Sequence, residues 1–195
     1  MYLNNDDGTG WSEDSSYSIT GTFGMAFGGD YRDGGARFVD LNNDGLVDVV
    51  QSLWCDGSSS FGYSVYINDV DGTCVSDAGY TVPVHFSCGG WDGGARLADI
   101  NSDGLVDIIV ADDLYDTNAI YLNDGDGTGW SLASGTLPVE FNLYNLNANP
   151  YDTGVRMMDV DGDGLMDFVR SDDSRSGGGG GVYIHDGEVA DLLTS

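Results

Sequence analysis

The stretch DLNNDGLVD (residues 40–48) places three aspartates and two asparagines within nine residues, with a glycine at the sixth position. Side chains that carry oxygen stand at positions 1, 3, 5 and 9. Two unit charges ~4 Å apart repel one another by about 4 kcal/mol at an effective dielectric of ~20. A chain tolerates such crowding where a cation occupies the loop, so the pattern favours a metal-binding loop over a plain polar turn.

The pattern occurs three times, in GARFVDLNNDGLVDVV (35–50), GARLADINSDGLVDIIV (94–110) and GVRMMDVDGDGLMDFV (154–169). The first aspartates, Asp40, Asp99 and Asp159, are 59 and then 60 residues apart. Each unit of this period predicts four short strands: one before the loop, one after it, a third in SVYIN or AIYLN, and a fourth that ends in PVHF or PVEF. Four strands at a fixed period are typical of β-propeller blades.

The sequence therefore predicts an all-β fold of blades with four antiparallel strands, about three blades' worth. Propellers close with about four to eight blades, so we do not expect a complete ring from this chain alone. Further blades would come from the same parent chain or from other copies. The predicted units are the outer half of an incomplete blade (1–24), two blades (25–86 and 87–141) and an incomplete blade (142–195).

Each loop offers the hard oxygen ligands that calcium prefers, and the glycine at position 6 permits a sharp turn. An EF-hand is excluded, because its acid at position 12 is replaced by Gln51, Val110 and Arg170. We expect three calcium ions per chain, each held by four side chains and by the carbonyl oxygen of the leucine at position 7. The ligands are Asp40, Asn42, Asp44, Leu46 and Asp48; Asp99, Asn101, Asp103, Leu105 and Asp107; and Asp159, Asp161, Asp163, Leu165 and Asp167.

With this loop, the period of about 60 residues and the Tyr-(Leu/Ile)-Asn third strand, the chain resembles the FG-GAP/VCBS-type repeats of integrin α-subunit propellers and bacterial surface proteins. The sequences GGAR and DTGVR stand where the family's own signatures would be. The resemblance implies calcium between strands one and two of each blade. It also implies an extracellular or cell-surface location, with adhesion or carbohydrate binding as the common role.

Arginines recur three residues before each first aspartate, at Arg37, Arg96 and Arg156, and an aspartate recurs four residues before each arginine. We expect these pairs to be structural. Cys55 and Cys88 follow the second and fourth predicted strands of one blade, on one face of a propeller, so we predict that they form a disulfide and leave Cys74 unpaired.

Aromatic residues in the loops after strands two and four are candidate platforms for a sugar ring, with packing at the rim as the favoured alternative. These residues are Trp54, Trp91, Tyr115 and Tyr151. His85 and His185 are expected to be solvated or locally bonded, because the equivalent positions of the other repeats hold residues of different chemistry.

Composition narrows the function. The chain has 33 acidic residues against 6 arginines and no lysine, and its formal charge is -27. This charge disfavours nucleic acid or an anionic membrane as partner, and no stretch is apolar enough for membrane insertion. Two histidines and no catalytic motif predict that the chain is not an enzyme.

The leading hypothesis is an extracellular calcium-binding repeat segment with a structural, adhesive or scaffold role, whose partners include a glycan or a cell-surface protein. The alternatives are a calcium-dependent, lectin-like carbohydrate binder and an accessory module of a secreted polysaccharide-active enzyme.

Overall fold

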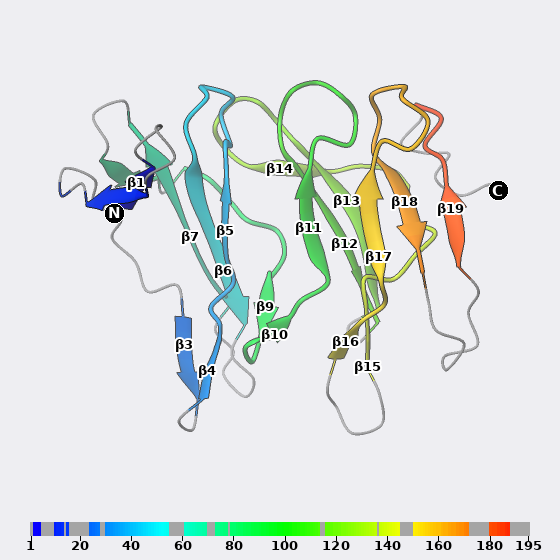
Figure 1. The fold of residues 1–195 in the computed structure, drawn as a ribbon, viewed down its shortest axis with the longest axis horizontal. Coiled ribbons are helices and arrows are strands. Elements are labelled where there is room, and N and C mark those ends of the chain that lie inside the picture. Colours follow the sequence, from blue (N-terminus) through cyan, green and yellow to red (C-terminus); the bar gives the residue numbers. More distant parts are fainter. Residues whose placement is uncertain are drawn as a thin grey trace.

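The computed structural model of the chain consists of strands and turns (Figure 1). It describes residues 2–4, 10–13, 15, 24–27, 30–54, 61–69, 73–77, 79–113, 116–135, 137–144, 150–171 and 180–187. In these ranges there is no helix, and hence none long and apolar enough to cross a membrane.

Three sheets repeat one arrangement, in which consecutive strands pair antiparallel. Blade 1 contains β5 (Ala36–Val39), β6 (Asp48–Trp54), β7 (Phe61–Asn68) and β8 (Cys74–Ser76). Blade 2 contains β11 (Ala95–Ala98), β12 (Asp107–Asp112), β13 (Thr117–Asn123) and β14 (Trp130–Leu132). Blade 3 contains β17 (Val155–Met158), β18 (Asp167–Arg170) and β19 (Gly181–Tyr183). The predicted all-β fold of propeller blades is confirmed, and the sheets fan out side by side without closing a ring (Figure 1).

Short hairpins accompany the blades. They are β1 (Tyr2–Asn4) with β2 (Trp11–Glu13), β3 (Gly24–Phe27) with β4 (Asp30–Asp33), β9 (Ser87–Cys88) with β10 (Trp91–Asp92), and β15 (Asn142–Tyr144) with β16 (Pro150–Asp152). β9 pairs in parallel with the end of β6, and β15 pairs likewise with β12. The hairpin β9–β10 thus lies in the sheet of blade 1, although its residues fall in the unit predicted for 87–141.

The fourth strands differ from the prediction. They are β8 and β14, directly after the third strands, and the PVHF and PVEF segments form no strand. Residues 80–86 instead form a connecting segment whose alternate side chains Val82, Val84 and Phe86 are buried. Pro83 has no N–H to donate to a strand ladder, and the alternation places apolar side chains between two blades. Residues 137–141 form the equivalent connecting segment before blade 3.

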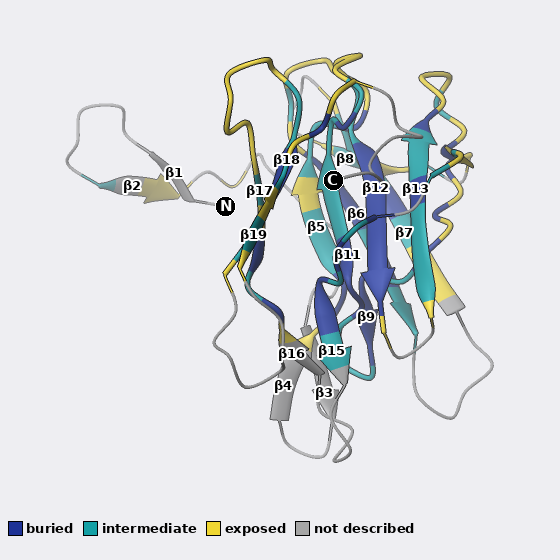
Figure 2. Cartoon of the chain, turned by 90° about the vertical axis from the view of Figure 1, so that its right-hand side faces the viewer, coloured by how far each residue is buried: buried dark blue, intermediate teal, exposed yellow. Residues whose placement is uncertain are grey.

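The core lies between the blades. One apolar cluster joins Leu41, Val50 and Val65 of blade 1 to the first connecting segment and to Ile108 and Val110 of blade 2. A second cluster joins the other side of blade 2 to blade 3 through the second connecting segment. Because side chains alternate along a strand, β12 contributes to both clusters and is buried along its length (Figure 2). Burying one such Val or Ile contributes about 1.5–3 kcal/mol, so facing blades stabilise one another.

Steric crowding explains the glycine that precedes the first strand of each blade. Gly35, Gly94 and Gly154 have φ of 71°, 70° and 76°, in the left-handed region. A Cβ on Gly35 would lie 2.2 Å from the carbonyl oxygen of Ser52, and one on Gly94 would lie 2.8 Å from that of Ala111. The recurrent glycine in GGAR and DTGVR therefore permits close packing of the turn against the end of the second strand.

Candidate functional site

Three acidic loops lie at one edge of the blades, each joining the first and second strands (Figure 1). We call them loop 1 (40–48), loop 2 (99–107) and loop 3 (159–167). Each loop begins directly after the first strand of its blade, and its last aspartate is the first residue of β6, β12 or β18. The antiparallel pairing therefore closes both ends of every loop, as in Met158 opposite Asp167.

The ninth aspartates, Asp48, Asp107 and Asp167, are fully buried. Each carboxylate accepts two backbone N–H groups. Oδ2 accepts from the residue after the first aspartate of the loop, at 2.8, 3.0 and 2.8 Å in loops 1, 2 and 3. Oδ1 accepts from the end of the third strand or just after it, at 2.8 Å in each of Asn68, Asn123 and His185. One carboxylate thus ties the loop to its own blade.

The first aspartate of each loop also faces inward. Asp40 accepts the N–H groups of Asp44 and Gly45 at 3.1 and 2.8 Å, and Asp99 accepts the equivalent pair in loop 2. In loop 3, Asp159 accepts from Gly162 and Gly164 at 2.6 and 3.0 Å. The N–H of the leucine at position 7, the predicted carbonyl ligand, donates to the aspartate at position 5 in all three loops. Backbone N–H groups thereby orient the carboxylates at positions 1 and 5 within each loop.

Loop 3 has the arrangement closest to an ion site. One carboxylate oxygen from each of Asp159, Asp161 and Asp167 lies within 4.8 Å of the others. Ligands at about 2.3–2.6 Å from a calcium ion are at most about 5 Å apart, so the spacing fits. In loops 1 and 2 the third position is an asparagine, whose Nδ2 donates to the aspartate at position 5 at 3.0 and 2.9 Å.

Electrostatics favour a cation in these loops. Burial raises the pKa of Asp107 to about 6, and the charges of Asp103 and Asp99 add to the effect, while the two N–H donors oppose it. Burial likewise raises the pKa of Asp48, with Asp44 and Asp40 contributing. A bound cation would favour the ionised carboxylates and offset this cost.

Neighbouring loops contact one another. The Nδ2 of Asn123, a buried residue of β13, donates to the carbonyl oxygen of Leu41 in loop 1 at 3.2 Å and to that of Val106 in loop 2 at 3.3 Å. The hydroxyl of Ser102 in loop 2 donates to the carbonyl oxygen of Gly164 in loop 3 at 3.0 Å. These contacts are not visible in the repeat pattern, because they join positions of different repeats.

The recurrent arginines form the structural pairs expected for them. Arg96 contacts Asp92 at 2.9 Å and lies 5.0 Å from the centre of the Phe141 ring, in the next connecting segment. Arg37 repeats this arrangement with Asp33 and Phe86, and it donates to the carbonyl oxygen of Phe86 at 3.3 Å. Arg156 pairs with Asp152 at 3.0 Å. Each arginine thus holds its own turn, and the first two also contact the following connecting segment.

Of the four candidate sugar-binding aromatics, the structure describes the side chains of Trp54 and Trp91, which both stand opposite Cys88 in the sheet of blade 1. Trp54 ends β6 and meets the ring of His85 edge-on, with centroids 5.6 Å apart, and Trp91 is 39% exposed in β10. Tyr115 and the side chain of Tyr151 lie outside the described residues, as does Cys55, so the disulfide with the buried Cys88 stays a prediction.

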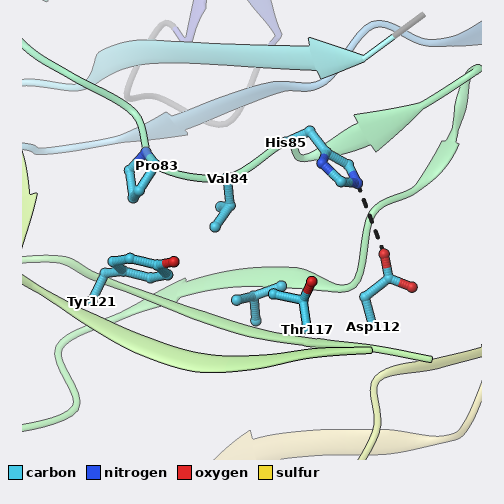
Figure 3. Close-up of a pocket in the computed structure, with 7 residues that line it drawn as sticks. Pro83, Val84, His85, Asp112, Thr117 and Tyr121 are labelled. Atoms are coloured by element: carbon cyan, nitrogen blue, oxygen red, sulfur yellow. Dashed lines mark ion pairs between the residues drawn. The ribbon is translucent and has the colours of Figure 1, made fainter. Parts of the chain in front are cut away.

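A cavity that sequence reasoning missed lies between the first connecting segment and blade 2 and has a volume of about 240 Å³ (Figure 3). At one end His85 and the buried Asp112 face each other, with Nε2 and Oδ2 3.8 Å apart. The cavity is lined by Pro83, Val84, His85, Val110, Asp112, Thr117 and Tyr121. The sequence predicts that both histidines are solvated or locally bonded. His85 is half-buried, and His185 is 1% exposed with its backbone N–H bonded to Asp167, so His185 is not solvated. His185 takes the position that Asn68 and Asn123 hold in the other repeats, and this shared position was the sequence signal for its burial.

Comparison with known proteins supports the repeat architecture. A family model described as an FG-GAP-like repeat matches residues 40–110 and again residues 99–170, which together exceed half of the chain. No curated protein matches the chain in sequence. A similar solved structure is that of an Agrocybe aegerita lectin, described by its specific recognition of non-reducing terminal N-acetylglucosamine. It is 21% identical, with a TM-score of 0.53 over 97% of this chain and 43% of that chain. This chain therefore spans less than half of the lectin's length, and at this identity the likeness shows the fold.

Proposed function

Because the chain belongs to the FG-GAP-like repeat family, we propose that it is a calcium-binding repeat segment of an extracellular protein, with a structural or adhesive role. The observation that carries the proposal is the convergence of Asp159, Asp161 and Asp167 on one point in loop 3. The same backbone bonds to the first and ninth aspartates recur in loops 1 and 2.

In each loop the ion would be held by the side chains at positions 1, 3, 5 and 9 and by the carbonyl oxygen at position 7. In loop 3 these positions are Asp159, Asp161, Asp163, Asp167 and Leu165. All four side chains there are carboxylates, against three carboxylates and one amide in the other two loops. We expect loop 3 to bind calcium most tightly if the geometry is equal, because ligand charge tunes affinity.

The ion would act on the fold through the ninth aspartate. Asp107 is held by N–H groups of Ile100 in loop 2 and Asn123 in β13, so a cation bound to it would connect the loop, the second strand and the third strand. It would also remove repulsion among carboxylates that the loop gathers. Ligand that binds only the folded state at a hundredfold excess over Kd adds about 2.7 kcal/mol of stability per site.

Calorimetric titration with calcium tests the proposal. The wild-type chain should bind three ions, and Asp161→Ala should lower the stoichiometry to two, because Asp161 is an exposed ligand whose loss leaves Asp167 and its backbone bonds in place. Asp126→Ala is the matched control, since Asp126 is an exposed aspartate in the turn between β13 and β14. No calcium uptake, or three ions bound by Asp161→Ala, would contradict the assignment.

A second candidate, carbohydrate binding, is favoured by the cavity between the first connecting segment and blade 2. A carboxylate, an imidazole and a hydroxyl converge there with the ring of Tyr121, and such polar groups beside an apolar wall suit a sugar (Figure 3). The similar solved structure is described as a lectin.

A glycan array probed with and without calcium separates the two candidates. Binding that is lost in Asp112→Asn and kept in Asp116→Asn would assign a sugar site to the cavity, since Asp116 is exposed and outside its lining. Equal binding by both variants, or none by the wild type, would exclude the cavity.

A further inference from the structure

A second cavity, with a volume of about 330 Å³, lies between β11 of blade 2 and β17 of blade 3, beside the second connecting segment. We call it the arginine cavity, because it takes two of the six arginines of the chain. Only one of its lining residues is acidic, in a chain that carries 33 acidic residues. The lining residues are Arg96, Phe141, Asp152, Val155, Arg156 and Met157.

Each of the two guanidinium groups uses only one edge for bonds within the protein. In Arg156, Nη1 and Nη2 donate to the two carboxylate oxygens of Asp152 at 3.2 and 3.0 Å, and Nη1 also donates to the preceding carbonyl oxygen at 2.7 Å. Arg96 makes the same three bonds, with Asp92 as its acid, at 3.0, 2.9 and 3.0 Å. In both arginines the Nε–H and the second N–H of Nη2 meet no acceptor among the residues that the structure describes. These two N–H groups are parallel and form a fork that matches the two oxygens of a carboxylate.

The equivalent arginine of blade 1 is bonded differently. Nη2 of Arg37 donates to Asp33 at 3.1 Å and also to the carbonyl oxygen of Phe86 at 3.3 Å, so part of its fork is already used. Arg96 lies over the ring of Phe141 and makes no hydrogen bond to its carbonyl oxygen. Arg37 is also absent from the linings of the two cavities described here. The unused forks therefore distinguish the arginine cavity from the same register of blade 1.

The electrostatics of the cavity favour an anion with a single charge. Hydrogen bonds from Arg156 lower the pKa of Asp152 most, burial opposes them, and the N–H of Gly154 and the charge of Arg96 add to the lowering. Both guanidinium groups thus act on the one carboxylate of the lining and leave a positive charge in excess there. The chain as a whole has a formal charge of -27, so it repels a doubly charged anion more strongly than a singly charged carboxylate.

We propose that the arginine cavity binds a small organic acid, whose carboxylate accepts the unused fork of Arg156 with Arg96 as a second cation beside it. The hydrocarbon part of the acid would lie against Val155 and Met157. Ligand clefts measure roughly 300–1,000 Å³, so this volume suits a small molecule. The cavity shares no residue with the three loops or with the cavity of Figure 3. Its failure to bind would therefore leave the calcium titration and the glycan array unaffected.

Nuclear magnetic resonance of the arginine Nε–H groups tests the proposal, because the chain has only six arginines and no lysine. Replacing single arginines by lysine assigns the signals. Sodium butyrate should shift the signals of Arg156 and Arg96 until they saturate, and it should leave Arg37 in place, with sodium chloride at equal ionic strength as the blank. Sodium sulfate should bind more weakly than butyrate. The absence of a saturable shift with butyrate, an equal shift of Arg37, or tighter binding of sulfate would overturn the proposal.

A conservative substitution separates the fork from the charge. Arg156→Lys keeps the positive charge and loses the planar fork, so it should weaken butyrate binding by about tenfold when the Arg96 signal is followed. Arg37→Lys is the matched control, because Arg37 has the same register and the same kind of ion pair outside the cavity, and it should bind butyrate as the wild type does. Near-ultraviolet circular dichroism and melting curves establish that both variants are folded. Unchanged affinity in folded Arg156→Lys, or an equal loss in Arg37→Lys, would overturn the proposal.

Discussion

Removing calcium should make the stability of the fold decrease as pH rises, and Asp107 sets the size of the effect. Its carboxyl is fully buried, and its pKa lies at about 6 in the folded chain against an ordinary value of 3.8. The difference of about two pKa units corresponds to about 3 kcal/mol at 1.36 kcal/mol per unit. The folded pKa is the higher one, so between these values the folded chain binds more protons than the unfolded chain. The free energy of unfolding without calcium should therefore fall from about pH 4 to pH 6 and stay low above.

Calcium should cancel this loss. The ion interacts with the carboxylate and not with the protonated acid, so its stabilisation grows as pH rises through the pKa of Asp107. At a hundredfold excess over Kd it adds about 2.7 kcal/mol at one site, which is close to the electrostatic cost of the empty site. Asp48, whose pKa is also raised, acts in the same direction.

Urea unfolding between pH 4.5 and pH 7.5, in calcium-free and in calcium-containing buffers, measures both curves. Asp107→Asn should flatten the calcium-free curve. Asp126→Asn should leave it unchanged over this range, because the hydroxyl and N–H of Thr128 lower the pKa of Asp126 and place its titration at lower pH. A calcium-free wild type whose free energy of unfolding rises steadily from pH 4.5 to pH 7.5 would refute the argument.

Three further outcomes are expected. Arg96→Ala should lower the free energy of unfolding in a urea titration by about 1–2 kcal/mol, because it removes the contact with the Phe141 ring and the partly exposed ion pair with Asp92. Arg156→Ala should lower it by less than about 1 kcal/mol, because the side chain of Arg156 is 60% exposed. Asn123→Ala should weaken calcium binding at both loop 1 and loop 2 in calorimetry, because one side chain bonds carbonyl oxygens of both; an effect on loop 2 alone would contradict the coupling. Mass spectrometry of a non-reduced digest should find Cys55 joined to Cys88, and a different pairing would refute the predicted face assignment.

The local features of this chain followed from its sequence, because their partners are close in the chain. The oxygen side chains of each loop lie within nine residues, and each paired arginine and aspartate are four residues apart. The period of about 60 residues then identified the blades, since a strand order that recurs at fixed spacing needs no knowledge of distant contacts.

Only the tertiary structure decided what the blades do to one another. The PVHF segment has strand-like alternation, but its buried side chains fill the space between two sheets, and the fourth strand is β8 instead. The bond from Asn123 to Leu41 spans 82 residues. Val160 and Ile100 occupy the same position of the repeat, and one is exposed while the other is buried. A repeat pattern treats equivalent positions as equal, whereas burial depends on whether another blade packs against that face, which is a property of the assembled row.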